Sequence, residues 1–397
     1  MVLKLSRLRS LMSPQRWLVV AVAALVLTAY GLSATEDRWE TALLDVASQR
    51  GPLPEDEWVS VIGVDRASLD KLGRWPLSRD VYATLIDRLS AARAKTIVLA
   101  IPLADVQSDP GLAVLRRMKG LLAAAASGAP LGPVERRLAD LVEQSEELLD
   151  VDAQLVRSLA RAGNVLLVAG YRAATPTDPP IPPLPPHLRK SAPAVSGVLW
   201  PTVADGVLPA APFVLSALGT GHAAVFPDRD GVVRREALWI NHGAQALPSV
   251  AWLAALRAQG RNPPDLNGRP GSPLVLGGRE VIPDEAGRVR PRPVRHASGA
   301  SVRVESLQDV LSGKVPAERW AGRTVFVGLT ATGLDPATVP TLDRPGAVDV
   351  VRLAQVSASL LTGQVVNRPV WAGYLGWILA VLAVVATGFM PTGQAAG

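Results

Sequence analysis

The pattern of apolar and polar positions is most regular between Trp58 and Pro102, where it predicts a strand, a helix and a second strand. Trp58–Asp65 (WVSVIGVD) alternates β-branched and small residues, and Asp80–Ala92 carries apolar residues at helical spacing. Lys95–Ile101 (KTIVLAI) is almost wholly apolar after its first residue. Strands that are apolar on both faces are typical of a parallel sheet covered by helices, so we expect a right-handed βαβ unit at the centre of an α/β domain.

The same reading of the remaining chain predicts a mixed, mainly parallel sheet covered by helices. The further strands expected are Asn164–Gly170, Val232–Ile240, short strands about Leu274, Val281 and Val289, and Gly322–Gly333. The further helices expected include Val134–Ala162, Leu247–Gly260 and Ala347–Leu361. The side chains expected on the buried face of the first of these helices are Leu138, Leu141, Val142, Leu148, Leu149 and Leu155.

Two long apolar runs flank this region. Trp17–Thr35 contains no charged residue over 19 positions and Val370–Met390 none over 21, which is the length that a helix needs to cross about 30 Å of hydrocarbon. Trp371, Tyr374 and Trp377 gather at one end of the second run, as aromatic residues do at a membrane interface. Both runs are therefore predicted to be transmembrane helices.

The first run has an alternative interpretation as a cleaved signal peptide, because basic residues precede it. Cleavage after Ala34 would place Leu32 at a position where a small residue is preferred, so an uncleaved anchor is favoured. In either case the basic segment 1–16 is expected in the cytoplasm and 36–369 outside it. The residues 391–397 then form a short tail, and the expected location is a bacterial inner membrane with a periplasmic main domain.

Composition and charge exclude several classes of function. The 397 residues include no cysteine, so the chain holds no disulfide, thiolate nucleophile or zinc–sulfur site. The formal charge is +6, but the arginines are scattered, and no nucleic-acid partner is expected. The nearest approach to a basic patch is Gly287–His296, which favours a solvated loop or an edge strand, with anionic lipid headgroups as the alternative partner.

No catalytic or metal-binding motif is present. The four histidines, His187, His222, His242 and His296, are not at metal-ligand spacing, and the chain contains neither HExxH nor GxSxG. Val327–Gly333 lacks the GK[ST] of a phosphate-binding loop, and Asp228–Gly231 has only part of a calcium-loop pattern. We therefore expect no catalysis, no metal and no cofactor.

A ligand site is expected in the loop after the first strand, because open α/β sheets bind ligands at the carboxyl ends of their strands. The residues that converge there are Asp65, Arg74 and Trp75. The alternative is structural: Asp65 caps a short helix that begins at Ala67 or Ser68, and Trp75 only packs.

Several segments in a fixed order resemble a known family. The run Val61–Ile101 resembles the opening signature of the extracytoplasmic sensory domain CHASE, type 2. The segment Asp228–Glu236 (DRDGVVRRE), preceded by Gly221 and His222, and the later segment Gly322–Asp335 are similar to further landmarks of that family.

The resemblance implies a sensory domain outside the inner membrane, after one N-terminal span. In this family three spans and a cytoplasmic cyclase, kinase or phosphatase usually follow. The present sequence has one C-terminal span and no output domain after it, so the signal is expected to pass to a separate membrane partner, to a second copy of the chain or to a continuation of the chain. It also has Ala100 where the family usually has aspartate and Asp105 where glutamate is common, so an acidic site is not implied here.

These observations together predict a membrane-anchored, non-catalytic domain that recognises a ligand for signal transduction. The expected partners are a small-molecule or envelope signal, the lipid bilayer, a separate cytoplasmic output protein and a second copy of the chain. Gly373, Gly376 and Ala380 are spaced for close packing between copies of the second span. A cell-envelope scaffold or assembly protein without a sensing role is the alternative.

Overall fold

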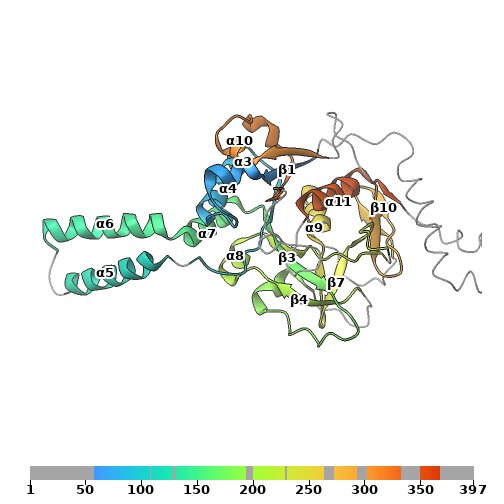
Figure 1. The fold of residues 1–397 in the computed structure, drawn as a ribbon, viewed down its shortest axis with the longest axis horizontal. Coiled ribbons are helices and arrows are strands. Elements are labelled where there is room, and N and C mark those ends of the chain that lie inside the picture. Colours follow the sequence, from blue (N-terminus) through green and yellow to red (C-terminus); the bar gives the residue numbers. More distant parts are fainter. Residues whose placement is uncertain are drawn as a thin grey trace, which may run out of the picture. The chain divides into compact units, whose positions relative to one another are not determined.

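The computed structural model is shown in Figure 1, and its described residues all fall within the unit Leu53–Asn367. The described residues are 58–107, 109–127, 131–193, 200–228, 230–262, 272–292, 302–331 and 349–366. The two predicted spans, Trp17–Thr35 and Val370–Met390, lie outside these ranges. Within the ranges, every helix is too short or too polar to cross a bilayer.

A mixed, mainly parallel sheet forms the centre of the unit, as the sequence predicts. Its strand order is β12-β1-β13-β2-β3-β4, and β5 pairs with β3 next to β4. All of these pairs are parallel except that of β3 with β4. The strands are β1 (Val59–Val64), β2 (Thr96–Ala100), β3 (Val165–Ala173), β4 (Val203–Val207), β5 (Gly219–His222), β12 (Arg303–Ser306) and β13 (Thr324–Leu329).

The predicted strand–helix–strand unit is present, but its two strands are not neighbours. β13 lies between them, so that Phe326 is in register with Val61 of β1 on one side and with Val98 of β2 on the other. The connection between two parallel strands can pass over a third strand, so β1 and β2 need not be neighbours in the sheet. The helices that join β1 to β2 leave room for a third apolar strand, which arrives from near the end of the chain.

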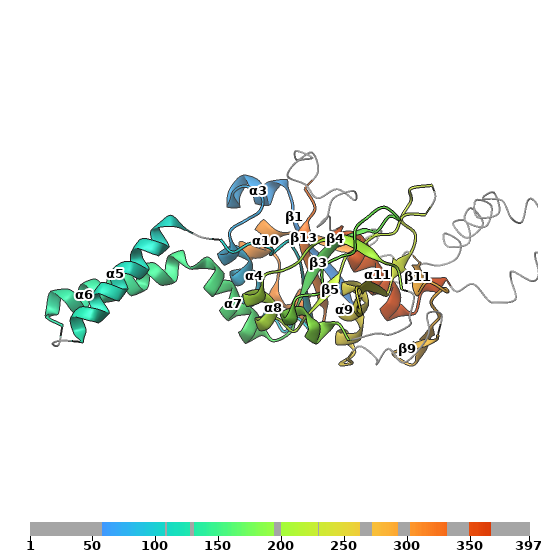
Figure 2. The same cartoon turned by 90° about the horizontal axis from the view of Figure 1, so that it is seen from below.

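Helices cover both faces of the sheet, and alternate residues of each strand supply the two cores. Ile62, Ile97 and Val325 face one layer, which contains α4 (Arg79–Ala91), α7 (Val151–Ala162) and α8 (Ala211–Ser216). Val61, Val98 and Phe326 face the opposite layer, which contains α9 (Val250–Ala258) and α11 (Val350–Thr362). Figure 2 shows α9 and α11 on the other side of the sheet from α4 and α7. The apolar strands predicted from the sequence are apolar because both of their faces are buried.

Short helices and small antiparallel sheets complete the unit. The short helices are α3 (Arg66–Leu72), α10 (Leu307–Leu311), η1 (Pro186–Ser191) and η2 (Ala317–Trp320). The small sheets pair β6 (Glu236–Ala237) with β11 (Arg288–Pro291), β11 with β14 (Val365–Val366), β7 (Trp239–His242) with β8 (Gln245–Pro248), and β9 (Leu274–Leu276) with β10 (Arg279–Val281).

The single strand predicted at Val232–Ile240 is wrong. β6 and β7 occupy only its second half, because the chain changes its pairing partner at Leu238, from β11 to β8.

The long helix predicted at Val134–Ala162 is also wrong, because it breaks at Asp150 into α6 (Pro133–Leu149) and α7. The Asp150 carboxylate accepts a hydrogen bond from the amide of Ala153 at 3.0 Å and thereby caps α7. α6 packs on α5 (Pro110–Ala126) instead of on the sheet, and the two lie side by side as a hairpin in both views (Figures 1 and 2). Only part of the expected buried face is therefore covered: Val142 and Leu155 are buried, whereas Leu138, Leu141 and Leu148 are exposed.

Candidate functional site

Asp65, the first of the predicted site residues, caps helix α3. One carboxylate oxygen accepts hydrogen bonds from the Ser68 amide at 2.9 Å, from the Ser68 hydroxyl at 2.5 Å and from the Ser306 hydroxyl at 3.0 Å. Burial raises the pKa of Asp65, but the hydrogen bonds from Ser68 and Ser306 outweigh it, and the net pKa is lowered. The capping role that the sequence offered as the alternative is thus present, and it ties α3 to the end of β12.

The other two predicted site residues lie in different environments. The Arg74 side chain is exposed, whereas Trp75 is partly buried and packs against the core beneath α3 and α4. The three residues do share the connection between β1 and α4, which contains α3 and lies at the carboxyl ends of the parallel strands. That a ligand contacts them stays a prediction.

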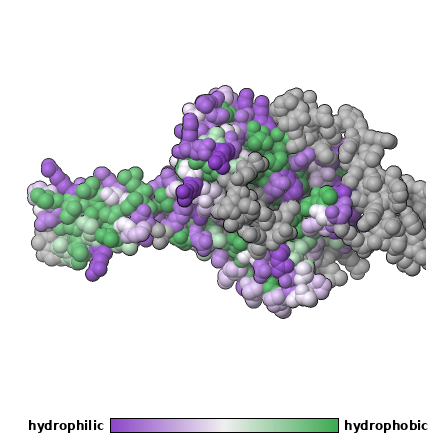
Figure 3. All heavy atoms as spheres, viewed as in Figure 1, coloured by the Kyte–Doolittle hydropathy of each residue, from purple (hydrophilic) through white to green (hydrophobic). Residues whose placement is uncertain are grey.

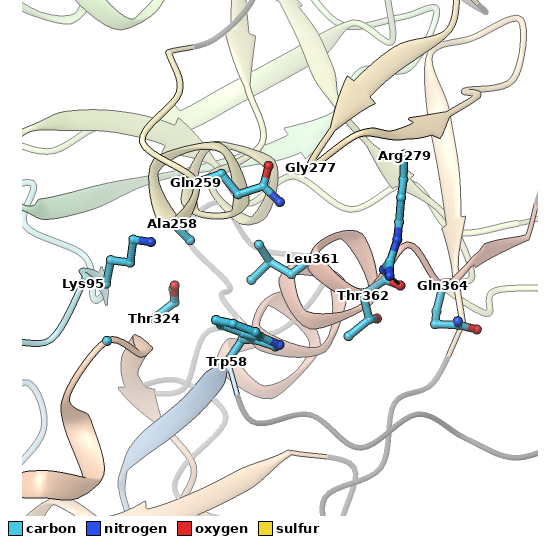
Figure 4. Close-up of a pocket in the computed structure, with 11 residues that line it drawn as sticks. Trp58, Lys95, Ala258, Gln259, Gly277, Arg279, Thr324, Leu361, Thr362 and Gln364 are labelled. Carbon is cyan, nitrogen blue, oxygen red and sulfur yellow. Dashed lines mark hydrogen bonds between the residues drawn. The ribbon is translucent and has the colours of Figure 1, made fainter.

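A pocket of about 530 Å³ opens at the opposite, amino-terminal edge of the sheet (Figure 4). Trp58, Lys95 and Thr324 stand at the starts of β1, β2 and β13, which are neighbours in the sheet. The remaining lining comes from the end of α9, the β9–β10 turn, the turn before β13 and the end of α11: Ala258, Gln259, Gly277, Arg279, Gly322, Leu361, Thr362 and Gln364.

The sheet holds the backbone of this pocket while its side chains remain accessible. The amide of Thr324 donates to the Trp58 carbonyl at 2.8 Å, and the amide of Lys95 donates to the Arg323 carbonyl at 2.8 Å. The Trp58 side chain is nevertheless 59 % exposed, and Lys95 is exposed as well.

The pocket combines apolar and cationic side chains: Trp58 and Leu361 lie between Lys95 on one side and Arg279 on the other (Figure 4). Lys95 and Gln259 reach toward the space above the Trp58 ring, and Leu361 borders the same space (Figure 4). Arg279 donates to the carbonyl of Thr362, and so fixes the end of α11. Among the described residues, the lining includes two cations and no acid. It therefore suits a small ligand that combines an apolar or flat part with an anionic group.

Gly277 keeps Gln259 in place at the rim of the pocket. Its φ is +59°, a backbone conformation that residues with a β-carbon rarely adopt. A Cβ built on it would lie 2.6 Å from the Gln259 amide nitrogen. A side chain at this position would be strained by the backbone conformation and would have to displace the end of the Gln259 side chain.

Sequence reasoning missed this pocket because its residues come from six separate stretches of chain. Each stretch alone is ordinary: a tryptophan before a strand, a lysine before another, the end of a helix. Only the parallel order of β1, β13 and β2 brings these starts together. The one local signal was a tryptophan at the beginning of a buried strand.

A buried ion pair anchors the other end of α11. Glu236 is 1 % exposed; its carboxylate accepts from the Arg352 guanidinium in the first turn of α11 and from the Ser249 hydroxyl at 2.5 Å. His222 is fully buried nearby, and burial together with the Arg352 charge lowers its pKa to about 3. His222 is therefore neutral at pH 7. One end of α11 is held by charge, and its other end lines the pocket.

The fold and the site define an α/β domain with a ligand-sized pocket, and its described residues include no cluster of side chains that could hold a metal ion. The chain belongs to the CHASE2 domain family, whose model matches residues 19–390, and CHASE2 domains are extracellular sensory domains. The resemblance stated from the sequence motifs is thereby confirmed. Neither the curated proteins nor the solved structures that were searched contain a match to this chain.

Proposed function

We propose that this chain is a membrane-anchored, extracytoplasmic sensory domain, without catalysis of its own, that recognises a small ligand in the pocket at Trp58 and Lys95. One observation carries the proposal beyond the family. The pocket is lined by Trp58, 23 residues after the first predicted span, and by Gln364, six residues before the second. The two predicted spans lie beyond these two points in the sequence, so a ligand in the pocket would contact both segments that lead to the membrane.

Such a ligand would act by preferring one arrangement of these segments. A ligand shifts an equilibrium between two conformations only by the difference between its affinities for them. The start of α11 is fixed by the Glu236–Arg352 pair, whereas its end is held by the contact of Arg279 with the Thr362 carbonyl. An anionic ligand that paired with the Arg279 guanidinium would draw it away from the Thr362 carbonyl. The end of α11 would then be free to move relative to Trp58. The response would then pass to a separate output protein, or to a second copy of the chain.

The pocket and its lining limit the ligand. A volume of about 530 Å³ lies within the range of roughly 300–1,000 Å³ that small-molecule sites occupy. The exposed Trp58 ring and the Lys95 ammonium favour a compound with an aromatic or apolar body and a carboxylate or phosphate. The loop of Asp65, Arg74 and Trp75 is the second candidate position for such a ligand.

The test is thermal unfolding of the purified full chain with a panel of small anionic compounds. A ligand that binds only the folded state raises the melting temperature, by mass action. We expect at least one compound to raise it in the wild type, and Lys95→Met to abolish the increase. Arg74→Met and Asp65→Asn are the controls at the other edge of the sheet, since asparagine keeps a capping oxygen but removes the charge.

Each outcome decides between the two positions. An increase that disappears with Arg74→Met or Asp65→Asn, but survives Lys95→Met, would move the site to the carboxyl ends of the strands. An increase that none of these substitutions affects, or no increase with any compound, would contradict the proposal.

A scaffold or assembly role is the second candidate function. The observation that favours it is an exposed apolar face on the α5–α6 hairpin, because large apolar surfaces on soluble domains usually mark interfaces.

A further inference from the structure

The α5–α6 hairpin exposes a continuous apolar face that nothing else in the described chain covers. We define this hairpin face as Val114, Met118, Leu121 and Ala125 of α5 with Val134, Leu138, Leu141 and Leu148 of α6. Leu121, Val134 and Leu148 are 67 %, 78 % and 74 % exposed. Figure 3 shows the corresponding band of hydrophobic surface along the hairpin.

The spacing within each helix is that of a helix-packing seam. The α5 positions follow one another by four, three and four residues, and in α6 the intervals are four and three, followed by seven across Ser145. Apolar residues that alternate at intervals of three and four form the contact stripe of coiled coils and helix bundles. The hairpin face therefore has the pattern of a surface that packs against further helices.

A second stripe already holds the hairpin together. Leu112 of α5 and Val142 of α6 are buried between the helices, and Leu115 and Leu149 are partly buried. On each helix, every residue of the hairpin face is followed in the sequence by a position of the inner stripe or of its continuation. Val114 precedes Leu115 on α5, for example, and Leu141 precedes Val142 on α6. Because the helices are antiparallel and turn by 100° per residue, these displaced stripes lie on the same side of the hairpin. The result is a flat apolar layer, two helices wide.

We propose that the hairpin face docks on the same face of a second copy of this chain and forms an antiparallel four-helix bundle. The distribution of charge selects a second copy as the occupant. α5 carries three cations and no acid; Arg116 and Lys119 already pair with Glu146 inside the hairpin, which leaves Arg117 to meet the acidic helix of another copy. α6 carries five acids and two cations. A layer with one basic and one acidic helix is complementary to itself when a two-fold axis sets α5 against α6 of the other copy.

This charge pattern also fixes the direction of the axis. Pairing α5 with α6 of the other copy requires a two-fold axis parallel to the helices, whereas a perpendicular axis would set α5 against α5 and α6 against α6. The parallel axis makes neighbouring helices antiparallel and leaves both sheet domains at the same end of the bundle. Leu121 then lies opposite Leu141 of the other copy, and Val114 opposite Leu148.

The size of the face predicts a weak dimer. Helices of 17 residues are about 25 Å long, and two side by side are about 20 Å wide. The bundle would bury about 1,000 Å² in total, near the lower limit for a specific interface. We therefore expect a reversible dimer whose population depends on concentration.

Disulfide cross-linking of the full chain tests the arrangement, since the wild-type chain contains no cysteine. Two differently tagged preparations, one with Leu121→Cys and one with Leu141→Cys, are mixed and oxidised under mild conditions. We expect a disulfide between the two tagged chains. The matched control mixes Ala123→Cys with Arg136→Cys, two exposed positions on the opposite side of the same helices, and we expect no cross-link.

Disruption of the face supplies the second measurement. Leu121→Glu should raise the dimer dissociation constant at least tenfold in sedimentation equilibrium, while Ala123→Glu should leave it unchanged. Both side chains are exposed, so the melting temperature of each variant reports that the fold is intact. The dimer is expected whether or not the pocket takes a ligand.

Three results would overturn the proposal. These are equal cross-linking by the control pair, a dimer that survives Leu121→Glu, and a chain that is monomeric at every concentration. A monomer in which Leu121→Cys is shielded from a water-soluble thiol reagent only in the presence of lipid vesicles would assign the face to a bilayer instead.

Discussion

Two buried side chains, His222 and Glu236, show how single residues carry opposite electrostatic roles in this domain. The Glu236 carboxylate pairs with Arg352 and accepts a hydrogen bond from Ser249, whereas His222 is kept neutral by burial and by the same Arg352 charge. A histidine at the end of β5 could not be distinguished from a candidate ligand by sequence. Its surroundings make it part of the core.

The His222 environment predicts a pH dependence of stability. Its folded pKa of about 3 lies below its ordinary value of about 6.5, so the unfolded chain binds more protons between these values. The stabilising contribution is therefore complete above about pH 6.5 and is lost as the pH falls toward 3. The slope is at most about 1.4 kcal/mol per pH unit for one group.

Urea unfolding of the full chain at pH 7 and at pH 5 measures this effect. We expect the loss of free energy of unfolding between the two pH values to be smaller in His222→Gln than in the wild type. Equal losses in both proteins would show that His222 does not titrate on unfolding in this range.

At the scale of elements, the Glu236–Arg352 pair joins the β6 strand to the first turn of α11. Removal of one partner leaves an uncompensated buried charge, which typically costs 3–5 kcal/mol. We expect Arg352→Met and Glu236→Met each to lower the free energy of unfolding, Arg352→Met by about this amount, and the double variant to cost less than the sum of the two single losses. Denaturant unfolding of the three variants forms the double-mutant cycle.

A matched exposed pair provides the control. Arg66 and Asp70 lie one turn apart on α3 with most of their side-chain surface in water, and Asp70→Asn should change stability by well under 1 kcal/mol. Additive losses in the cycle would mean that Glu236 and Arg352 do not stabilise each other.

For several strands, the local pattern of apolar residues was sufficient to predict the secondary structure. The strands β1, β2 and β3 were predicted within three residues, and β13 lies inside the predicted segment Gly322–Gly333, because both faces of these strands are buried and this makes them apolar throughout. The helix predicted at Val134–Ala162 failed because its two halves are amphipathic toward different partners, α5 for one and α4 for the other. A continuous apolar pattern cannot reveal that its partner changes at Asp150.

For the whole molecule, the sequence predicts two spans with the basic segment 1–16 in the cytoplasm. The main domain should then lie outside, and both termini inside. A periplasm-dependent phosphatase fused after Pro209 is expected to be active in bacterial cells, and the same reporter fused after Gly397 to be silent. A silent fusion at Pro209, with the fusion protein present at normal levels, would contradict this topology.

The sequence by itself determined the fold class, the main strands, the family and the segments predicted to enter the membrane. Each of these depends on residues close together in the chain, because side chains alternate every two residues in strands and every three to four in helices. The capping role of Asp65 was likewise one of two local alternatives.

Only the tertiary structure decided which elements are neighbours. β13 could be predicted as a strand, but not as the strand between β1 and β2, because neighbour choice depends on packing between distant segments. That order brings the starts of three strands together and creates the pocket at Trp58 and Lys95. Likewise, leucines expected in the core lie on the exposed hairpin face, because α6 packs on α5 and not on the sheet. An amphipathic pattern shows that a face needs a partner, and the fold determines which partner it receives.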